Sequence, residues 1–362
     1  MKISSNLSLW TILSIFAQQT FAAESSQPVQ SKLSVSGYLE TYYLHDFNRP
    51  SDDLRPGFTY SHNVTDKPSI NLGFIKANFN TEWVRANLAL GSGTYMRANY
   101  ALEPKDLQKL FEANIGLKLS DTVWIDAGLL PSHIGFESAI GIDNWTVTRS
   151  MLADNSPYFE TGLRLSYTSE DGRWYASGLI LNGWQRIQRP DGNTTPSMGH
   201  QLTYKPNSRI TFNSSSYIGN DKSDEDRRMR YFHNFYGQYQ LNDQWGLITG
   251  FDIGAEQSEK NSSRYNVWFT PIVIAKFTYS DKLSMSARAE YYQDKDQVIV
   301  TTDTPKGFRT FSYSANLDYK ISKHFALRAE LRKFHSKDKI FQQKDSFSEE
   351  SLSATTALIM QF

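Results

Sequence analysis

Apolar and polar residues alternate with a period of two along most of the chain beyond residue 31. This period is typical of β-strands, because successive side chains of a strand point to opposite faces of the sheet. The pattern predicts about 16 strands, and most of them reach the ~9–11 residues that a tilted strand needs to cross a bilayer. The predicted strands are 33–45, 69–80, 81–91, 111–119, 123–130, 159–168, 174–183, 198–205, 209–219, 230–241, 245–257, 266–279, 283–293, 307–321, 325–335 and 352–362.

One side of each predicted strand is apolar and the other is polar, often charged. In 325–335, Leu327 and Leu331 alternate with Arg328 and Arg332. A transmembrane barrel turns its apolar side to lipid and its polar side to the lumen. A soluble β-sandwich would need a second layer to cover so many apolar faces, and no helices or extra layer are predicted. The pattern therefore favours an all-β fold, a transmembrane antiparallel β-barrel.

The connections between the predicted strands alternate between short and long. Because short and long connections alternate strictly, all turns lie at one end of the barrel and all loops at the other, as in barrels with short periplasmic turns and long external loops. Residues 103–110, in the second loop, fit either a helical turn or a plain loop. The tight turns are 120–121, 170–172, 206–207, 242–243, 280–281 and 322–323; the long loops are 46–68, 92–110, 131–158, 184–197, 220–229, 258–265, 294–306 and 336–351.

The first 23 residues have the composition of a secretory signal peptide. Lys2 precedes an apolar stretch, and the small residues Ala22 and Ala23 mark the cleavage site. The apolar stretch is too short for a spanning helix of ~20 residues. We expect residues 1–23 to be a signal peptide, 24–32 a short periplasmic leader and 33–362 an outer-membrane β-barrel.

Charge and composition exclude several classes of protein. Lysine plus arginine number 38 and aspartate plus glutamate number 38, so the chain lacks the basic surplus of a nucleic-acid binder. It has no cysteine, which excludes disulfides, thiolate metal sites and thiol catalysis. Aromatic residues make up 14% of a chain whose mean hydropathy is only -0.51. Girdles at the two membrane interfaces would explain these rings, and the candidates are Tyr42, Tyr43, Trp245, Trp268, Tyr279, Tyr291, Tyr292, Tyr313, Tyr319 and Phe325.

The segment 128–167 carries the most specific motif of the chain. It resembles the OmpL-like putative beta-barrel porin family of Gram-negative outer-membrane proteins. Phe159 departs from the motif, where tyrosine is more common. The resemblance implies an outer-membrane barrel with porin activity, and it assigns no substrate and no catalytic residue. The matching residues are His133, Ile134, Gly135, Phe136, Glu137, Asp143, Asn144, Thr148, Arg149, Ser150, Ala153, Asp154, Ser156, Pro157, Tyr158, Glu160, Thr161 and Gly162.

The motif occupies the third external loop, 131–158, the loop that folds into the lumen and narrows the pore in general porins. On one interpretation, charges of this loop face wall arginines across a constriction, and the transverse field sorts solutes by charge and size. The alternative is that Asp143, Arg149 and Asp154 form ion pairs within the loop and hold it against the wall. The proposed constriction residues are Glu137, Asp143, Arg149 and Asp154 of the loop and Arg85, Arg164, Arg328 and Arg332 of the wall.

Further charged residues fall on the polar side of the strands and are expected to line the lumen. Their signs are nearly balanced, which predicts weak ion selectivity unless the third loop imposes one. The C-terminal Phe362, preceded at alternate positions by apolar residues, resembles the terminal strand that the barrel-assembly machinery recognises. The expected lumen wall comprises Glu40, Lys76, Glu112, Lys118, Asp126, Glu160, Asp252, Lys276, Arg288, Glu290, Asp318, Lys320 and Glu330.

No catalytic or cofactor motif stands out in the sequence. The histidines lack metal-ligand spacing, and phosphate loops and nucleophile elbows are absent. We therefore expect no enzyme, no metal and no cofactor. An outer-membrane hydrolase using His45 or His133 is one alternative, and a non-conducting structural or adhesive barrel is another.

The sequence thus predicts a porin of the bacterial outer membrane, through which small hydrophilic solutes diffuse passively. A barrel of about 16 strands leaves a water-filled lumen, whereas one of about 8 is filled by side chains. Expected partners are outer-membrane lipid and lipopolysaccharide, the barrel-assembly machinery and the solutes, with no nucleic acid. A homotrimer would be in keeping with this size, although no subunit face can be identified from the sequence.

Overall fold

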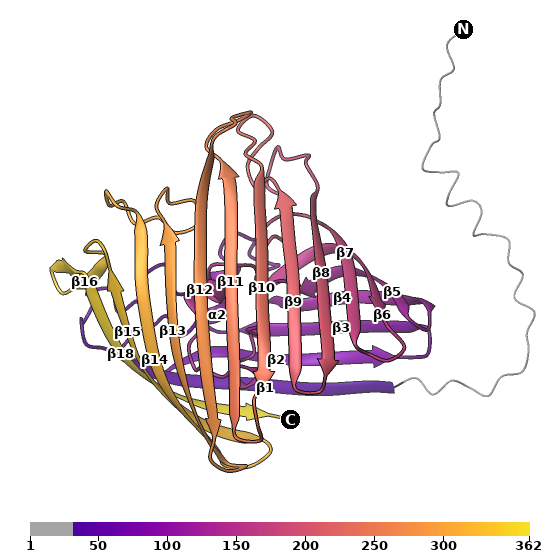
Figure 1. Ribbon diagram of the computed structural model, residues 1–362, viewed down its shortest axis with the longest axis horizontal. Coiled ribbons are helices and arrows are strands. Elements are labelled where there is room, and N and C mark those ends of the chain that lie inside the picture. The colour runs from indigo at the N-terminus through magenta and orange to yellow at the C-terminus, as the bar shows by residue number, and fades with distance from the viewer. Residues whose placement is uncertain (1–31) are drawn as a thin grey trace, which may run out of the picture. The chain divides into compact units, whose positions relative to one another are not determined.

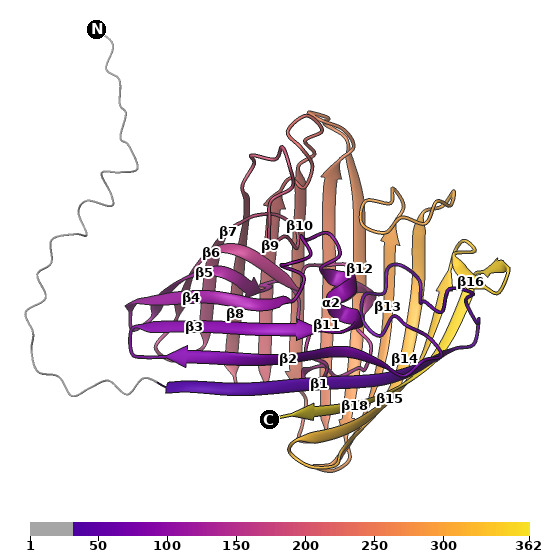
Figure 2. The same ribbon diagram turned by 180° about the vertical axis from the view of Figure 1, so that it is seen from behind.

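The computed structural model describes residues 32–362. Within these residues, 16 antiparallel strands form one closed barrel, shown from opposite sides in Figures 1 and 2. The predicted fold class is confirmed. The predicted signal peptide, and all but the last residue of the predicted leader, lie outside the described residues. The barrel strands are β1 (Lys32–Asp46), β2 (Ser69–Asn80), β3 (Val84–Ser92), β4 (Leu110–Ser120), β5 (Val123–Pro131), β6 (Phe159–Thr168), β7 (Trp174–Leu181), β8 (Ser197–Asn207), β9 (Ile210–Gly219), β10 (Arg230–Gln240), β11 (Trp245–Gln257), β12 (Tyr265–Thr278), β13 (Leu283–Asp294), β14 (Phe308–Lys320), β15 (Phe325–Ser336) and β18 (Glu350–Gln361).

Each strand pairs with its neighbours in sequence, and β1 closes the barrel against β18. The closing seam extends to the last residue, because Phe362 and Gly37 exchange two backbone hydrogen bonds of 3.0 and 3.1 Å. Closure leaves no strand edge unpaired within the barrel, which is a requirement for a sheet in lipid. Among the described residues, no helix has the length and apolar character needed to cross a membrane.

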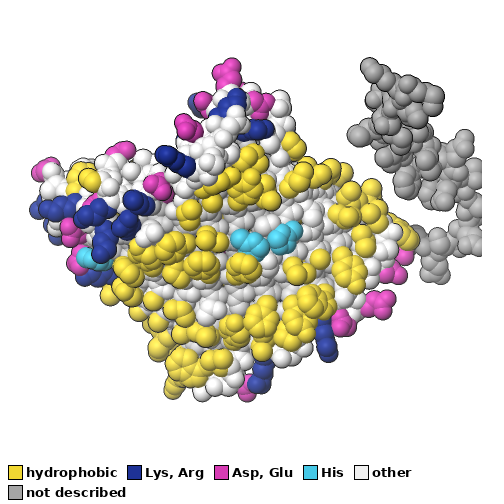
Figure 3. Space-filling model, turned by 45° about the horizontal axis from the view of Figure 1, so that its top comes forward, with side chains coloured by type: hydrophobic (Ala, Val, Ile, Leu, Met, Phe, Trp, Pro, Cys, Tyr) yellow, Lys and Arg dark blue, Asp and Glu magenta, His cyan; other side chains and the backbone are white. Residues whose placement is uncertain are grey.

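The alternation along each strand separates an apolar outer surface from a polar lumen, as predicted. On β15, Leu327 and Leu331 are exposed on the outside, whereas Arg328 and Arg332 are buried inside the barrel. Figure 3 shows the resulting hydrophobic belt, with charged side chains gathered toward its borders. The belt is suited to the hydrocarbon region of a bilayer.

Three of the aromatic residues expected at the membrane interfaces lie in the lumen instead. Tyr42, Trp268 and Tyr292 are almost completely buried. Trp268 packs with Phe232 inside the barrel, and the Tyr42 hydroxyl accepts a hydrogen bond from the Val64 amide. These rings have apolar neighbours in the lumen because long loops fold into it and form two clusters there, one around Trp268 and Tyr292 and one around Tyr42.

The long connections contain the remaining secondary structure. A short helix, α2 (Thr94–Asn99), lies in the second loop, whereas 103–110 forms turns without a helix until β4 begins. The third loop contains the 3-10 turn η1 (Gly141–Asp143) and the helical turn α3 (Met151–Asp154). The last loop contains a hairpin that the alternation did not predict, formed by β16 (Phe341–Gln343) and β17 (Ser346–Ser348).

Candidate pore constriction

The third loop, between β5 and β6, folds into the lumen and contacts strands on several sides of the barrel. We call residues 132–158 loop 3. Near its start, the Gly135 amide donates to Asn234 on β10 at 3.3 Å. Farther along, the Gly141 amide donates to the Tyr38 hydroxyl on β1 at 2.9 Å, and the Val147 amide donates to Asn316 on β14 at 2.9 Å. Loop 3 therefore crosses the lumen instead of standing above it.

Arg328 on β15 forms the first strong attachment of loop 3 to the wall. Its guanidinium donates to the Gly141 carbonyl at 2.6 Å and to the Asn144 carbonyl at 2.8 Å. The same group pairs with Asp318 on β14 at 2.7 Å, so its charge is compensated. Arg328 is 1% exposed and is covered by the loop that it binds.

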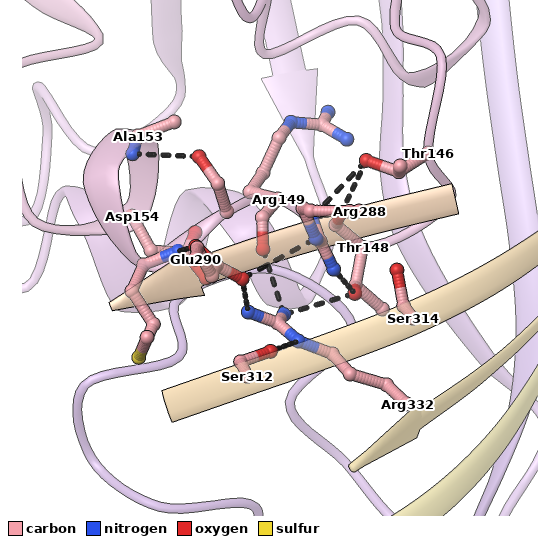
Figure 4. Close-up of polar contacts among 12 residues, drawn as sticks. Thr146, Thr148, Arg149, Ala153, Asp154, Arg288, Glu290, Ser312, Ser314 and Arg332 are labelled. Atoms are coloured by element: carbon pink, nitrogen blue, oxygen red, sulfur yellow. Dashed lines mark hydrogen bonds and ion pairs between the residues drawn. The ribbon is translucent and has the colours of Figure 1, made fainter. Parts of the chain in front are cut away.

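A second attachment is a charged cluster of Arg288, Glu290, Glu330 and Arg332 on β13 and β15. Figure 4 shows Arg288, Glu290 and Arg332 of this cluster with the loop. The two arginines donate to the carbonyls of Thr148 and Arg149 at 2.8 and 2.7 Å. The two glutamates accept the backbone amides of Thr148 and Met151 at 2.5 and 2.6 Å. Ion pairs of 2.6–2.7 Å connect Arg332 with Glu290 and Arg288 with Glu330. Such charge-assisted bonds are the strong class of hydrogen bond.

Inside loop 3, Arg149 and Glu137 brace the chain. Arg149 is fully buried and donates to the carbonyls of Ala139 and Val147 at 2.5 and 3.3 Å. Glu137 accepts the Ser150 amide at 3.0 Å and also the Ser150 hydroxyl, which caps α3. Across the described residues, no ion pair joins Asp143, Arg149 and Asp154, so the loop is held by wall groups bound to its backbone and not by the internal pairs considered from the sequence.

The start of loop 3 is fixed by His133. Its ring is buried between Glu160 on β6, at 2.8 Å, and the Ser216 carbonyl on β9, also at 2.8 Å. This arrangement gives His133 a structural role. His45, the other histidine considered for a hydrolase, pairs with Asp66 of the first loop at 2.5 Å.

The family model for "Putative beta-barrel porin-2, OmpL-like" matches residues 32–362, that is, all of the described chain. The chain belongs to this porin family. The resemblance drawn from the loop 3 motif is thereby confirmed. A search of curated proteins found no similar sequence.

Several solved structures that share the barrel fold are of channel proteins. An anion-selective porin from Comamonas acidovorans matches with a TM-score of 0.62 and 11% identity, over 92% of this chain and 100% of that one. The outer membrane channel DcaP of Acinetobacter baumannii gives 0.59 and 12%, over 92% and 97%. OmpF of Salmonella typhi, in a complex with daunomycin, gives 0.58 and 11%, over 92% and 98%. At these identities the likeness concerns the fold. Together with the family match, it makes this porin a passive-diffusion channel of the outer membrane.

The first loop of the porin also folds inward, which the sequence did not indicate. We call residues 47–68 loop 1. His62 of loop 1 is completely buried and bonds Glu40 on β1 at 3.1 Å, while Asn71 donates to the second oxygen of Glu40 at 2.8 Å. Ser61 contacts the backbone of Arg149, and Arg55 is buried nearby. Loop 1 therefore packs against loop 3 and supports it.

The wall formed by β2 to β6 carries the remaining constriction candidates. Arg85 and Arg164 both bind Asp126, at 2.6 and 3.1 Å, and neither contacts loop 3 among the described residues. Lys76 pairs with Glu112 at 2.5 Å. A cavity of about 310 Å³ separates this wall from loop 3 and is lined by Lys76, Glu112, Phe111, Phe136, Tyr95 and Tyr158, among others. The porin thus has one wall tied to loop 3 and another that faces open space.

The other expected wall residues also lie on the lumen side of their strands. Asp252 is buried and accepts a bond from Asn234 at 2.5 Å. Lys118 pairs with Asp121 of the adjacent turn at 2.7 Å. Lys276 lies 5.7 Å from the centre of the Trp145 ring in loop 3, and Lys320 is exposed near the turn end of β14.

Asp154 gives loop 3 of the porin a pH dependence. It is buried in α3, and burial raises its pKa to about 7, although Arg332, Arg149 and Arg55 oppose the rise. A raised carboxyl pKa means that the packed loop favours the protonated acid, so packing is most stable below the ordinary value of 3.8 and weakens as pH rises to about 7. We therefore expect Asp154→Asn to stabilise the packed loop at neutral pH and to leave stability at pH near 4 almost unchanged.

Thermal unfolding in detergent, followed by circular dichroism across this pH range, would measure the effect. The difference in melting temperature between Asp154→Asn and the native porin should grow as pH rises. Asp281→Asn, in an exposed turn, is the control and should follow the native curve. A pH-independent difference for Asp154→Asn would contradict the assignment.

Proposed function

We propose that this porin conducts small hydrophilic solutes and prefers anions. The charges expected on the lumen side are nearly balanced in sign, but burial divides the two signs unequally. The carboxylates Glu40, Glu160, Glu290 and Glu330 are each at most 4% exposed because they bind loops 1 and 3. A carboxylate that is covered and paired acts only weakly on a solute in the water-filled part of the lumen.

Cationic side chains remain accessible in the half of the lumen nearest the short turns, which we call the turn-side vestibule. The side chains of Lys76, Arg85 and Arg164 are 24%, 31% and 21% exposed, whereas Asp126, which two of them share, is 1% exposed. Two arginines on one carboxylate leave a positive excess at this point. The vestibule is defined by Lys76, Arg85, Lys118, Arg164, Lys205, Lys276 and Lys320.

The excess of positive charge in the vestibule is increased by Lys205, Lys276 and Lys320. Among the described residues, none of the three forms an ion pair. The accessible carboxylates in reach are fewer, namely Asp143 and Glu137 of loop 3, Asp318, which Arg328 binds, and Asp121, which pairs with Lys118. A narrow aqueous passage lined mainly by one sign of charge raises the local concentration of the opposite ion. This observation carries the proposed anion preference.

Planar-bilayer recording of the purified porin in a KCl gradient would test both parts of the proposal. Discrete current steps are expected, and the reversal potential should have the sign of the chloride equilibrium potential. An absence of steps would contradict conduction of small ions. A reversal potential with the sign of the potassium equilibrium potential would contradict the anion preference but not the proposed channel activity.

We further propose that the porin is exported by the signal peptide 1–23 and is inserted by the barrel-assembly machinery through its C-terminal strand. The position of Phe362 at the closing seam supports this role, because its backbone completes the β1–β18 pairing. Outer-membrane lipid and lipopolysaccharide would surround the apolar belt. We expect transport by diffusion and no enzymatic step, since His45 and His133 are both engaged in structural pairs.

A further inference from the structure

Four consecutive strands of the barrel, β7 to β10, contain no aspartate or glutamate. They lie side by side (Figure 1) and form the longest run of strands without a carboxylate in the barrel. Elsewhere the lumen wall contains ion pairs, such as Arg85 with Asp126 and Arg328 with Asp318. On β7 to β10, the turn-side vestibule is lined mainly by neutral hydrogen-bonding side chains. This part of the wall therefore differs in chemistry from the rest of the vestibule.

The register of these strands places four lumen-facing side chains in one row. Tyr175, Thr203, Asn213 and Tyr236 are successive cross-strand partners from β7 to β10, and cross-strand partners lie on the same face of a sheet. This face is the lumen side, because Thr203 and Asn213 are buried and bond each other at 2.7 Å. The adjacent Phe212 points outward and is 42% exposed. The row thus has a tyrosine at each end and polar groups between them.

A pocket of about 420 Å³ in the lumen wall includes most of this row and the positions next to it on the turn side. It combines two tyrosine rings, neutral hydrogen-bonding groups, a lysine and an arginine, and no carboxylate from residues 32–362 lines it. Aromatic surface with a few placed polar groups is typical of sites that bind small molecules. We call it the tyrosine pocket, and its defining residues are Tyr175, Thr203, Lys205, Thr211, Tyr236 and Gln238.

Most polar groups of the tyrosine pocket are available to a solute. The side chains of Tyr175, Thr211, Tyr236 and Gln238 are partly exposed. In the part of the chain that the structure describes, none of these four side chains forms a hydrogen bond with another protein group. Two phenolic hydroxyls, a threonine hydroxyl and a carboxamide can therefore donate and accept hydrogen bonds there.

Lys205 supplies the free charge of the tyrosine pocket. It is exposed, and it forms no ion pair with any described residue. Arg173, the other cation that lines the pocket, pairs with Asp171 at 3.5 Å. One unpaired ammonium group matches a solute with a single negative charge. A carboxylate carries one charge at neutral pH, whereas a phosphate monoester carries about 1.5 to 2.

The tyrosine pocket lies beside loop 3. Phe136 of the loop packs edge-on against Tyr236, with ring centroids 5.6 Å apart. Phe136 also lines the cavity of about 310 Å³ between loop 3 and the wall of β2 to β6. A solute in the tyrosine pocket would therefore lie next to the loop that crosses the lumen, where it would obstruct the passage of small ions.

We propose that the tyrosine pocket binds an acidic sugar, that is, a sugar ring with one carboxylate, as it passes through the pore. The inference rests on the proposed anion preference and names the class of solute. A simple anion needs only positive charge. Sugar hydroxyls need neutral donors and acceptors, and the C–H face of a sugar ring packs on an aromatic ring. The pocket supplies all three, in the Lys205 ammonium, the Gln238 carboxamide and the two tyrosine rings.

Block of the small-ion current tests this proposal. In single-channel recordings in KCl, added glucuronate should interrupt the current, because a bound sugar ring obstructs the passage. Its half-blocking concentration should be at least about tenfold lower than that of glucose, which lacks the charge, and that of acetate, which lacks the ring and hydroxyls. Equal half-blocking concentrations for the three solutes would overturn the proposal.

Two variants test whether the block occurs in the tyrosine pocket. Tyr175→Ala should raise the half-blocking concentration of glucuronate at least about fivefold, because an aromatic contact surface is lost, and Gln238→Ala should raise it in the same way. Asn78→Ala is the matched control, since it removes a lumen-facing carboxamide from β2 in the opposite wall, and it should give the native value. The heat-modifiable band of a folded barrel on gels shows that each variant is assembled. Native values in both folded pocket variants would overturn the assignment.

Calorimetric titration of glucuronate into the detergent-solubilised porin separates this inference from the proposed function. If the porin gives no current steps, or prefers cations in KCl, the proposed function fails. Heat of glucuronate binding that Tyr175→Ala abolishes would still support the tyrosine pocket. An anion-preferring current with neither block by glucuronate nor heat of binding would overturn the pocket alone.

Discussion

Replacing Arg328 and Arg332 together with alanine should increase the single-channel conductance of this porin severalfold. The two guanidiniums bind three carbonyls of loop 3, those of Gly141, Asn144 and Arg149, at 2.6–2.8 Å. Their removal also leaves Asp318 without its arginine partner and leaves Glu290 with Arg288 alone, at 3.2 Å. Breaking one buried ion pair costs about 3–5 kcal/mol, and detaching the loop lets water reach these carboxylates. The loop should therefore leave the wall and widen the passage.

Lys320→Ala is the matched control, since it removes a positive charge from the same wall without a loop contact. Its conductance should stay close to the native value. Liposome swelling with sugars of increasing size would measure the widening independently. If the double variant forms folded barrels with native conductance and the native size limit, loop 3 does not set the width of the pore.

Exchanging Lys205, Lys276 and Lys320 for glutamate should reverse the ion preference from anions to cations. These lysines lie in the turn-side vestibule and take part in no ion pair among the described residues. The triple exchange therefore changes the sign of the accessible charge without breaking a buried pair. Arg85 and Arg164 are less suitable positions, because glutamates there would face Asp126 and like charges at short range are destabilising.

The reversal potential in a KCl gradient is the measurement, repeated at high and low salt because screening should weaken the effect. Lys260→Glu, Lys337→Glu and Lys339→Glu together form the control, since these exposed lysines lie in loops at the opposite mouth. The control should keep the native sign. A triple vestibule variant that remains as anion-preferring as the native porin would show that the selectivity arises elsewhere.

The barrel could be predicted from the sequence because the pattern that specifies each strand is local. Each strand repeats the same two-residue alternation, and lipid on one side with water on the other imposes it everywhere. The same alternation cannot tell which lumen-facing positions are wet. Trp268 and Tyr292 were expected at the membrane interface, yet they pack in the lumen against groups brought there by loops. Loop paths depend on contacts distant in sequence, and no periodic pattern encodes them.

The candidate site was predictable to a similar extent. The loop 3 motif identified the segment that enters the lumen, but not which of its charges meet a solute. Arg149, Arg328 and Arg332 are buried in attachments of the loop, whereas Arg85 and Arg164 remain partly exposed. Arg55 and His62 of loop 1 carried no signal, because an isolated arginine or histidine in a loop is usually solvated. Only the folded chain shows that loop 1 packs on loop 3.

The attachment of loop 3 to the barrel wall through its backbone has a consequence for evolution and engineering. Wall arginines and glutamates bind carbonyls and amides of the loop, which every residue type other than proline supplies. A new side chain facing the passage can therefore be introduced without breaking the hydrogen bonds between the loop backbone and the wall. Different sequences could be grafted between these attachment points, and each would give the same barrel a different solute selectivity.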